Sequence, residues 1–383
     1  MLANVLRSLI RPSGERARPY VGFVAEVPEP LQVTPATEMH STQAGFRLRT
    51  LLAARRMARE CPAWLIPAHL AARPGGFDSL GVAGAIFIGR YTIGAMGKNH
   101  GAFVQLANWL NQKKAPMAVV ADVTDDFDVL PLKDTDTLRF LSDWQAALLR
   151  NCHITVTCNA LRDSLAASAK HGITVIEDPY EAAGLSPWRA PGNGPIRICW
   201  FGNTAAATLP SLTRALEAIL GRYPDTAFSI ELVTAARWEM IRPLAERLAQ
   251  ARPGLEVSLT EWSLEATWRA LERCDFVLLP HETQDAWAKG KSHNRLAAAI
   301  AAGRIALASP IPSYLELKDY AWVDDDLAGG IAWALSNPAA ARERVERGQA
   351  HVERHHSTAA VAEKWSRTLG RALSMRAQSG DGA

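Results

Sequence analysis

Short apolar runs alternate with amphipathic segments along almost the whole chain of 383 residues. Runs that are apolar throughout are typical of parallel strands buried on both faces. The segments between them repeat their apolar residues with the 3.6-residue period of a helix. This alternation predicts parallel sheets with helices on both faces. We expect strands at residues 20–27, 63–67, 84–89, 117–123, 154–157, 174–177, 196–201, 228–234, 255–259, 276–280 and 305–309, and helices at residues 46–60, 102–113, 137–150, 160–171, 209–222, 238–250, 264–273 and 292–302, before a mostly helical tail at 327–374.

Residues 183–195 interrupt this alternation with three prolines and three glycines, which is typical of a linker. The chain is also too long for one ordinary core. We therefore expect an α/β protein with two Rossmann-like, doubly wound domains that face a cleft, at residues 1–190 and 191–356. Residues 357–383 are expected to form a closing helix and a loose tail. Ligands of such folds bind outside the carboxyl ends of the strands.

Charge and cysteine content narrow the function classes. A net charge of +3 is too small for the dense basic stripe of a nucleic-acid-binding protein. The five cysteines form no C-x-x-C pair, which favours reduced thiols and the cytoplasm. No apolar run reaches the ~18 residues that a membrane span needs. Residues 1–11 form a basic amphipathic stretch, for which a packed first helix and a weak contact with an anionic membrane surface are the two interpretations.

The segment Lys289-Gly290-Lys291-Ser292-His293-Asn294-Arg295 carries the strongest functional signal. It lies where an apolar, alanine-rich helix begins, and the free N–H groups and dipole of a helix N-terminus favour an anion. Lys291 and Arg295 are four residues apart, so they share a helix face if the helix begins early enough to include Lys291. Together with Ser292 and Asn294 they suit a pyrophosphate. Gly303 is expected to end this helix as its C-cap.

Three other loops of the C-terminal half follow predicted strands and offer polar side chains. In each of them a plain structural turn remains the alternative. His281 is placed to stabilise charge on a leaving group or to orient a phosphate. Glu316 and Tyr314 suit the hydroxyls and ring of a nucleoside. The candidates in these loops are Gly202, Asn203 and Thr204, then His281 and Glu282, then Ser313, Tyr314 and Glu316, with Trp262 and Trp287 as aromatic residues near the loops.

In the N-terminal half, Asp122, Asp125 and Asp126 follow a strongly apolar run. Carboxylates clustered at a strand end suit a general base or a site for sugar hydroxyls. A divalent cation and a solvated turn are the alternatives. Trp144 and Trp365 lie at positions expected in the core. Further candidates at the rim of this half are His40, Arg47, Arg90, Lys98, Asn99 and His100, the last three in a polar segment between two glycines.

The order of segments in the C-terminal half resembles glycosyltransferases of the GT-B fold, in particular group 1 (family 4-like). The segments are ICWFGN, FVLLPHE, KSHNRLAAAIAAGRIALAS and PSYLEL. Residues 41–49 (STQAGFRLR) look like the loop and first helix near the family's acceptor site. The helix at 357–373 is similar to the family's last helix, which crosses back to the first domain. The resemblance covers residues 20–375.

The resemblance implies a nucleotide-sugar donor in the C-terminal domain, an acceptor in the N-terminal domain, and no obligatory metal or other cofactor. It places Lys291 and Asn294 in the donor site, with Gly202 and Asn203 opposite. Arg47, Lys98, Asn99 and His100 become the acceptor candidates. Two features depart from the family. Its paired glutamates are replaced by Gly290 and Ala298, and residues 202–207 lack its Arg…Lys pair.

We therefore predict a glycosyltransferase that moves a hexosyl or related group from a nucleotide diphosphate sugar to a glycan, lipid-linked or protein acceptor. Catalytic roles are expected for Asp122, Asp125, Asp126, His281 and Lys291. The expected setting is cell-surface polysaccharide synthesis in the cytoplasm, with peripheral contact at the inner face of the membrane as a variant. One alternative is a non-catalytic protein that binds a sugar or nucleotide or acts as a scaffold. Another is a nucleotide-sugar epimerase.

Overall fold

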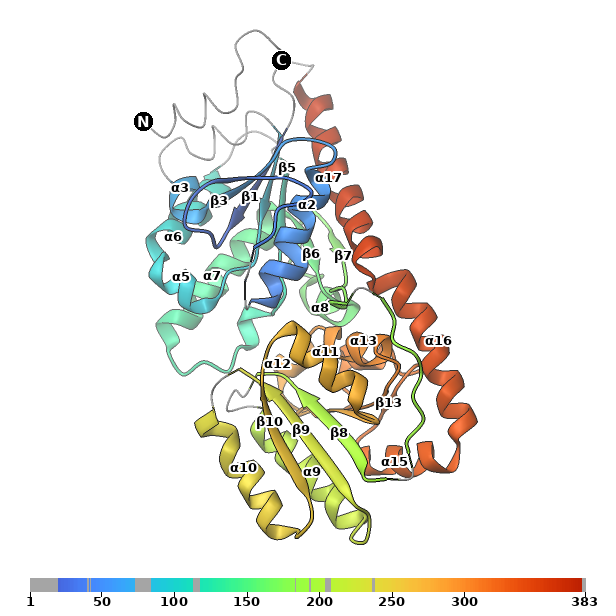
Figure 1. Ribbon diagram of the computed structural model, residues 1–383. Helices are drawn as coiled ribbons and strands as arrows, with labels where there is room; N and C mark the ends of the chain where they lie inside the picture. Colours follow the sequence, from blue (N-terminus) through green and yellow to red (C-terminus); the bar gives the residue numbers. More distant parts are fainter. Residues whose placement is uncertain are drawn as a thin grey trace. The chain divides into compact units, whose positions relative to one another are not determined.

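The computed structural model describes residues 20–39, 41, 43–72, 84–112, 118–182, 184–192, 194–203, 208–235 and 238–380 (Figure 1). The chain divides into two compact units, Met1–Asp178 with Thr358–Ala383, and Pro179–Ser357. The amphipathic stretch 1–11, His40 and Thr204 lie outside the described residues. No helix in the described part is both long and apolar enough to cross a membrane.

The first unit is built on a sheet in the order β2-β3-β1-β4-β5-β6-β7, parallel except for β2. Without β2 this is a doubly wound order, as the alternating sequence pattern predicts. The strands are β1 (Tyr20–Ala25), β2 (Leu31–Val33), β3 (Ala63–Pro67), β4 (Gly84–Ile88), β5 (Ala118–Asp122), β6 (His153–Val156) and β7 (Ile173–Val175). The helices are η1 (Phe46–Leu51), α2 (Leu52–Met57), α3 (Ala68–Ala71), α5 (Ile93–Lys98), α6 (His100–Gln112), η2 (Phe127–Val129), α7 (Thr135–Asn151), α8 (Asn159–Leu165) and α17 (Thr358–Gly380).

Helix α17 returns from the end of the chain to complete the core of the first unit. It buries Val361, Trp365 and Leu369, which are four residues apart and share one helix face. The Trp365 ring meets Phe87 of β4 edge to face, with ring centroids 5.3 Å apart. Residues nearly 300 positions apart in the sequence thus share one core.

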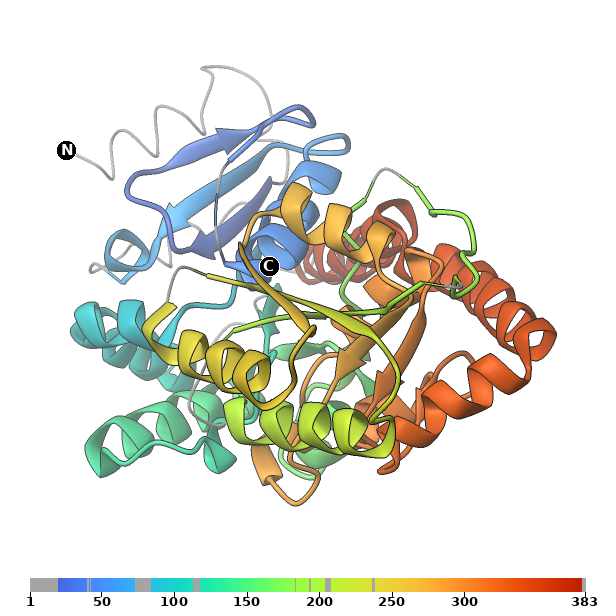
Figure 2. The same cartoon turned by 60° about the horizontal axis from the view of Figure 1, so that its bottom comes forward.

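The second unit has a fully parallel sheet in the order β10-β9-β8-β11-β12-β13. Numbered within the unit this is 3-2-1-4-5-6, the order of a dinucleotide-binding Rossmann fold. Helices α9, α10 and α15 pack on one face of the sheet and α11 and α13 on the other (Figure 2). The elements are β8 (Ile196–Phe201), α9 (Leu209–Arg222), β9 (Phe228–Thr234), α10 (Trp238–Ala251), β10 (Glu256–Glu261), α11 (Leu264–Arg273), β11 (Phe276–Leu279), α12 (Ala286–Lys289), α13 (Asn294–Ala301), β12 (Ile305–Ala308), α14 (Pro312–Leu315), β13 (Trp322–Val323), α15 (Leu327–Ser336) and α16 (Pro338–His356).

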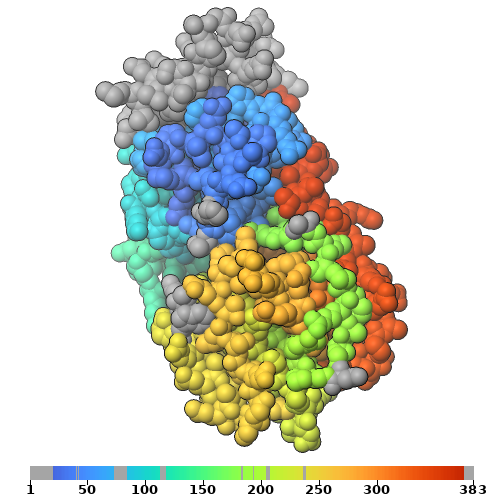
Figure 3. Space-filling view, viewed as in Figure 1, coloured from blue at the N-terminus to red at the C-terminus, as the bar shows by residue number. Residues whose placement is uncertain are grey.

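The division of the chain differs from the predicted boundary at residues 190 and 191. The first unit ends at Asp178, and the proline- and glycine-rich segment belongs to the second unit. There Ser186 N donates to Ala301 O at 3.0 Å, and Arg304 donates to Pro187 O at 3.1 Å. Figure 3 shows the segment, in lime green, on the surface of the second unit. This segment, here called the strap, is packed on the second unit and is not a linker between the two units.

The predicted helix at residues 46–60 begins with six residues of π-helix, η1, and ends as α2 at Met57. The wider π turn places Arg49 and Thr50 side by side in the interior, where both are fully buried. An α-helical turn predicted from apolar periodicity alone gives no reason to bury an arginine.

Candidate functional site

The order of strands in the second unit has its switch point between β8 and β11, where ligands of doubly wound folds bind. Helix α13 begins there, and its second residue, Arg295, reaches the ends of both strands. One guanidinium nitrogen donates to Phe201 O of β8 at 3.3 Å, and the other lies 2.7 Å from His281 Nε2, just after β11. The hydroxyl of Tyr314, after β12, lies 3.3 Å from the same His281 nitrogen. A main-chain carbonyl at the end of β8 and side chains that follow β11 and β12 therefore converge near Arg295.

Arg295 has only neutral partners in this cluster. Burial, together with the charges of Arg295 and Lys291, lowers the pKa of His281 well below its usual 6.5, so the imidazole is neutral and accepts from the guanidinium. Burial also raises the pKa of the fully enclosed Tyr314, which keeps its hydroxyl protonated. Within the described residues no carboxylate forms a salt bridge with Arg295. A half-buried cation without a counter-charge favours an anionic ligand.

Lys291 adds a second positive charge beside this cluster. Its ammonium lies 3.1 Å from the centroid of the Trp287 ring, a cation–π contact. Trp287 is held by α12, whose N-cap Asp285 accepts from Trp287 N at 3.0 Å. Ser292 Oγ accepts from Asn294 N at 3.2 Å at the start of α13. The structure therefore places Lys291, Ser292, Asn294 and Arg295 around one helix N-terminus. Helix α13 begins at Asn294, so Lys291 precedes the helix and does not share a helix face with Arg295.

Gly202 leaves room for this arrangement. A Cβ atom at Gly202 would lie 2.8 Å from the Arg295 guanidinium and 3.3 Å from the Trp200 ring. Any larger residue would push Arg295 away from the end of β8. Asn203 follows at the same strand end, but the neighbouring Thr204 is outside the described residues.

Of the remaining donor candidates, Glu282 is engaged in a salt bridge, whereas Ser313 is buried and Glu316 is partly exposed. Ser313 is fully buried, and its hydroxyl has no hydrogen-bond partner among the described residues. Glu316 caps the C-terminal end of α14 and is partly exposed. Glu282, in contrast, forms an exposed salt bridge with Arg214 of α9 and is occupied in this structure.

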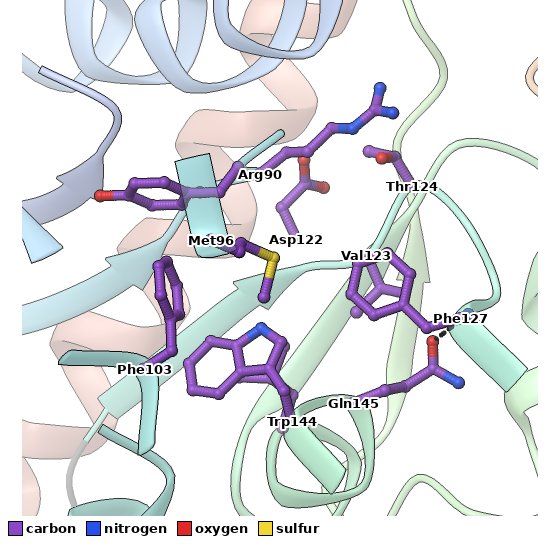
Figure 4. Close-up of a pocket in the computed structure, with 12 residues that line it drawn as sticks. Arg90, Met96, Phe103, Asp122, Val123, Thr124, Phe127, Trp144 and Gln145 are labelled. Carbon is purple, nitrogen blue, oxygen red and sulfur yellow. Dashed lines mark hydrogen bonds between the residues drawn. The ribbon is translucent and has the colours of Figure 1, made fainter. Parts of the chain in front are cut away.

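A small pocket lies at the carboxyl ends of β4 and β5 in the first unit (Figure 4). Arg90 lies on its polar side, and a guanidinium nitrogen of Arg90 lies 2.7 Å from Asp125 Oδ2. Gly45 lies against Arg90, since a Cβ there would come within 2.6 Å of the arginine side chain. The pocket is lined by Gly89, Arg90, Tyr91, Met96, Phe103, Asp122, Val123, Thr124, Phe127, Trp144, Gln145 and Leu148.

Asp122 is not available to a substrate, contrary to the prediction of a catalytic role. Its carboxylate is fully enclosed and accepts from Arg49 at 2.7–2.9 Å and from Thr155 Oγ1 at 2.9 Å. Arg49 also donates to Asp178 Oδ1 at 3.0 Å. Burial by itself lowers the pKa of Arg49, but the charges of Asp122 and Asp178 outweigh it, so the pKa lies above its ordinary value. Asp122 thus belongs to a buried structural ion pair.

The other two aspartates of the cluster differ from each other. Asp126 caps η2 by accepting from Asp128 N at 3.1 Å, and it also accepts from Gln145 at 2.9 Å. These bonds give it a structural role, as the predicted alternative of a turn anticipates. Asp125 stands beside Arg90 at the pocket and remains the candidate base. In the described part of the chain, no three His, Cys, Asp or Glu side chains are grouped to hold a metal ion.

The acceptor candidates do not gather into one cluster. Arg47 donates to Ser41 O at 2.6 Å, in the loop before η1. Asn99 is the C-cap of α5 and uses its amide to donate to Ala95 O at 2.9 Å. His100 packs on Phe140, with ring centroids 4.4 Å apart, and Lys98 is exposed at the end of α5. The polar segment thus forms the junction of two helices.

Two features of the first unit escape the sequence analysis. Arg49 appears in the sequence only as one of several arginines in an amphipathic helix. Trp144, expected in the core, is indeed 4% exposed, but it also lines the pocket. Its position on α7, facing the end of β5, depends on how the helix packs on the sheet, which periodicity cannot predict.

Comparisons with known proteins agree with this architecture. Residues 237–367 match the family described as glycosyl transferase-like. No curated protein sequence matches the chain. Among solved structures, TarM of S. aureus, in a complex that contains UDP, is 13% identical with a TM-score of 0.50 over 74% of this chain. This chain spans about half of TarM, covering 55% of it.

Two other solved structures are similar over nearly their full length. The α,α-trehalose 6-phosphate synthase of Burkholderia multivorans is 12% identical with a TM-score of 0.56, over 96% of this chain and 99% of that one. WaaG, a glycosyltransferase involved in lipopolysaccharide biosynthesis, is 12% identical with a TM-score of 0.55, over 91% of this chain and 100% of that one. The chain thus has the GT-B fold, and its glycosyl transferase-like segment confirms the resemblance to group 1 glycosyltransferases.

Proposed function

We propose that this protein is a glycosyltransferase that uses a nucleoside diphosphate sugar as donor. The observation that carries the proposal is the guanidinium of Arg295, which lies at the switch point of a Rossmann sheet with neutral partners only. Lys291 and the N-terminus of α13 add positive potential at the same place. A diphosphate is the ligand whose charge this arrangement balances.

The same groups would act on the reaction itself. When the bond between the sugar C1 and the diphosphate oxygen breaks, negative charge develops on the leaving diphosphate. Arg295 and Lys291 stabilise that charge, and loss of one such group typically costs 10²–10³-fold in rate. Neutral His281 keeps Arg295 in place by accepting its hydrogen bond. These protein cations support a reaction without an obligatory metal.

The first unit supplies the acceptor side in this proposal. The acceptor hydroxyl forms the new bond to C1, and Asp125 takes its proton, with Arg90 fixing the orientation of the carboxylate at 2.7 Å. A glycan acceptor is favoured, because WaaG acts in lipopolysaccharide biosynthesis. Synthesis of a cell-surface polysaccharide in the cytoplasm is the setting that we propose.

A non-catalytic binding protein is the second candidate, and one observation favours it. Gly290 and Ala298 stand where the resemblance places two glutamates. A protein that has lost them but kept Arg295 and Lys291 would still bind a nucleotide. Detection of a transferred sugar separates the two candidates.

The first experiment is a thermal-shift screen against UDP, GDP, ADP, CMP and their sugars, with and without Mg²⁺. A ligand at 100 times its Kd stabilises the native protein by about 2.7 kcal/mol. We expect one nucleotide diphosphate to raise the Tm, and the shift to be lost in Arg295→Ala and strongly reduced in Lys291→Ala. Lys289→Ala is the matched control, since Lys289 is exposed at the end of α12. Equal shifts in all four proteins would contradict the proposed site.

The second experiment measures the product. The nucleotide sugar identified by the screen is incubated with a panel of glycans, and transferred sugar is detected by mass spectrometry. Transfer supports the enzyme, whereas nucleotide binding without transfer or hydrolysis supports the binding protein. Asp125→Asn is expected to lower transfer and leave the nucleotide shift unchanged.

A further inference from the structure

The pocket of the first unit has an apolar interior of limited size. Met96 of α5, Phe103 of α6 and Trp144 of α7 form its inner wall, and each is at most 4% exposed. Phe103 meets Trp144 edge to face, with ring centroids 5.1 Å apart. The cavity has a volume of about 20 Å³, so it takes one small group.

Two polar side chains in the wall are already engaged. The Asp122 carboxylate is held by Arg49 and Thr155. The Gln145 amide accepts from Phe127 N at 2.8 Å and donates to Asp126 at 2.9 Å. The hydrogen-bonding groups of both side chains are therefore occupied by other residues of the protein and are not open to a ligand in the pocket. This part of the wall therefore favours an apolar group.

One donor in the wall is free to bond a guest. Trp144 is 4% exposed, and its indole N–H makes no hydrogen bond with another described residue. Figure 4 shows the indole nitrogen on the side of the ring that faces Met96 and the pocket. The indole N–H is a donor that reaches into the pocket and is not bonded to a described residue. An oxygen acceptor belonging to a guest would be its partner.

A group that combines a methyl with a carbonyl oxygen meets both requirements. We propose that this pocket binds the acetamido group of an acceptor sugar, with the methyl against Met96 and Phe103 and the carbonyl oxygen accepting from Trp144 Nε1. A plain hydroxyl would leave the apolar wall without contact, and the methyl of a deoxy sugar would leave the indole N–H unbonded.

The proposal deepens the proposed function, on which it rests, by naming the class of acceptor. Arg90 and Thr124 line the same pocket, and both contact Asp125: the Arg90 guanidinium forms an ion pair with it and the Thr124 hydroxyl donates to its carboxylate. A sugar anchored by its acetamido group thus brings ring hydroxyls next to Asp125. The pocket selects the acceptor, and the carboxylate receives the proton.

Two disaccharides that differ in the acetamido groups alone provide the test. N,N′-diacetylchitobiose and cellobiose share their linkage and ring configuration. We expect the full-length protein to bind the first at least about fivefold more tightly, the effect of one added hydrogen bond. In saturation-transfer NMR the acetyl methyl protons are expected to receive the strongest signal, because they contact Met96 and two aromatic rings.

Two variants test whether the pocket causes the preference for N,N′-diacetylchitobiose over cellobiose. Trp144→Phe keeps an aromatic ring and removes the N–H, and Val123→Ile adds a methyl group to the lining. Both are expected to reduce the preference to less than twofold. Trp64→Phe on β3 is the control, because Trp64 does not line the pocket. Hydrogen-exchange protection of β1, β4 and α2 is expected to stay unchanged in all three variants, which shows that the first unit is folded.

Three outcomes would overturn the inference. They are equal affinity for the two disaccharides, a preference that survives Trp144→Phe, and weak saturation of the acetyl methyl. In each of these cases a retained nucleotide shift leaves the proposed function standing. If no nucleotide raises the Tm of the wild-type protein, the proposed function is contradicted, and this inference, which rests on it, is contradicted as well.

Discussion

Arg49 illustrates how a single buried charge depends on its partners. Its guanidinium is fully buried between Asp122 and Asp178. Arg49→Met would leave two carboxylates in the interior without a counter-charge, which typically costs 3–5 kcal/mol of unfolding free energy. Urea denaturation checks this, with Arg56→Met as the control because its pairs with Glu60 and Glu363 are solvent-exposed and contribute at most about 1 kcal/mol. A similar loss of unfolding free energy in Arg49→Met and Arg56→Met would show that the buried ion pair does not contribute more to stability than the exposed one.

The lowered pKa of His281 predicts that the unfolding free energy depends on pH. In the native state its pKa lies well below 6.5 because of burial, Arg295 and Lys291. As pH falls below about 6.5, the unfolded chain binds a proton at this residue and the native protein does not. Stability is therefore lost on acidification, by up to about 1.4 kcal/mol per pH unit. His281→Gln is expected to remove this component, measured as the difference in unfolding free energy from wild type between pH 7 and 5.

The residues of the candidate site were predictable to different degrees. Lys291, Ser292, Asn294 and Arg295 are close in sequence at a helix start, so local pattern suffices to group them. Asp122 is different, because its role depends on Arg49, which lies 73 residues earlier. A carboxylate at a strand end has the same sequence signature whether it faces a substrate or a buried guanidinium.

Helix α13 depends on the glycine that ends it. Gly303 has a φ of 70°, and a Cβ there would lie 2.6 Å from Pro187 O and 2.7 Å from Ser186 O. Gly303→Ala combines left-handed strain with this overlap and is expected to cost about 1–3 kcal/mol. Gly370→Ala in α17 is the matched control, since open space surrounds its Cβ position, and it should stabilise by roughly 0.5–1 kcal/mol. The Tm of each variant provides the measurement. A tolerated Gly303→Ala would mean that the strap can move away.

Elements with a long, regular pattern were predicted well and short ones were not. The bounds of β8, β9, α9 and α11 agree with the predicted ranges. The strands β2 and β13 contain three and two residues, too few for an alternating pattern to appear. The strap at 183–195 resembles a linker in composition, because proline and glycine indicate irregular backbone and not the absence of packing.

At the scale of the whole molecule, the fold class follows from the sequence but the division into units does not. Two parallel sheets are implied by the order of strands and helices, and both are present. Which unit a segment joins is decided by long-range packing. The first unit is interrupted at Asp178 and resumes with α17 at Thr358, after the 179 residues of the second unit.

This discontinuous composition makes the first unit sensitive to the end of the chain. Trp365 is fully buried against Phe87, and its ring also lies 5.1 Å from the Arg49 guanidinium. Trp365→Ala removes a large core side chain and is expected to cost about 3–5 kcal/mol. Hydrogen exchange followed by mass spectrometry should show faster exchange in β1, β4 and α2, while β8, β9 and β11 keep their protection, since each unit has its own core.

Nucleotide binding provides the second readout for Trp365→Ala. Because the candidate phosphate site lies wholly in the second unit, the variant should keep the nucleotide-induced stabilisation of that unit while it loses transfer activity. Trp333→Ala, at a half-buried position of α15 in the second unit, is the control and should increase exchange in that unit instead. Equal loss of protection in both units of Trp365→Ala would show that they unfold as one, and the core of each would then not be independent.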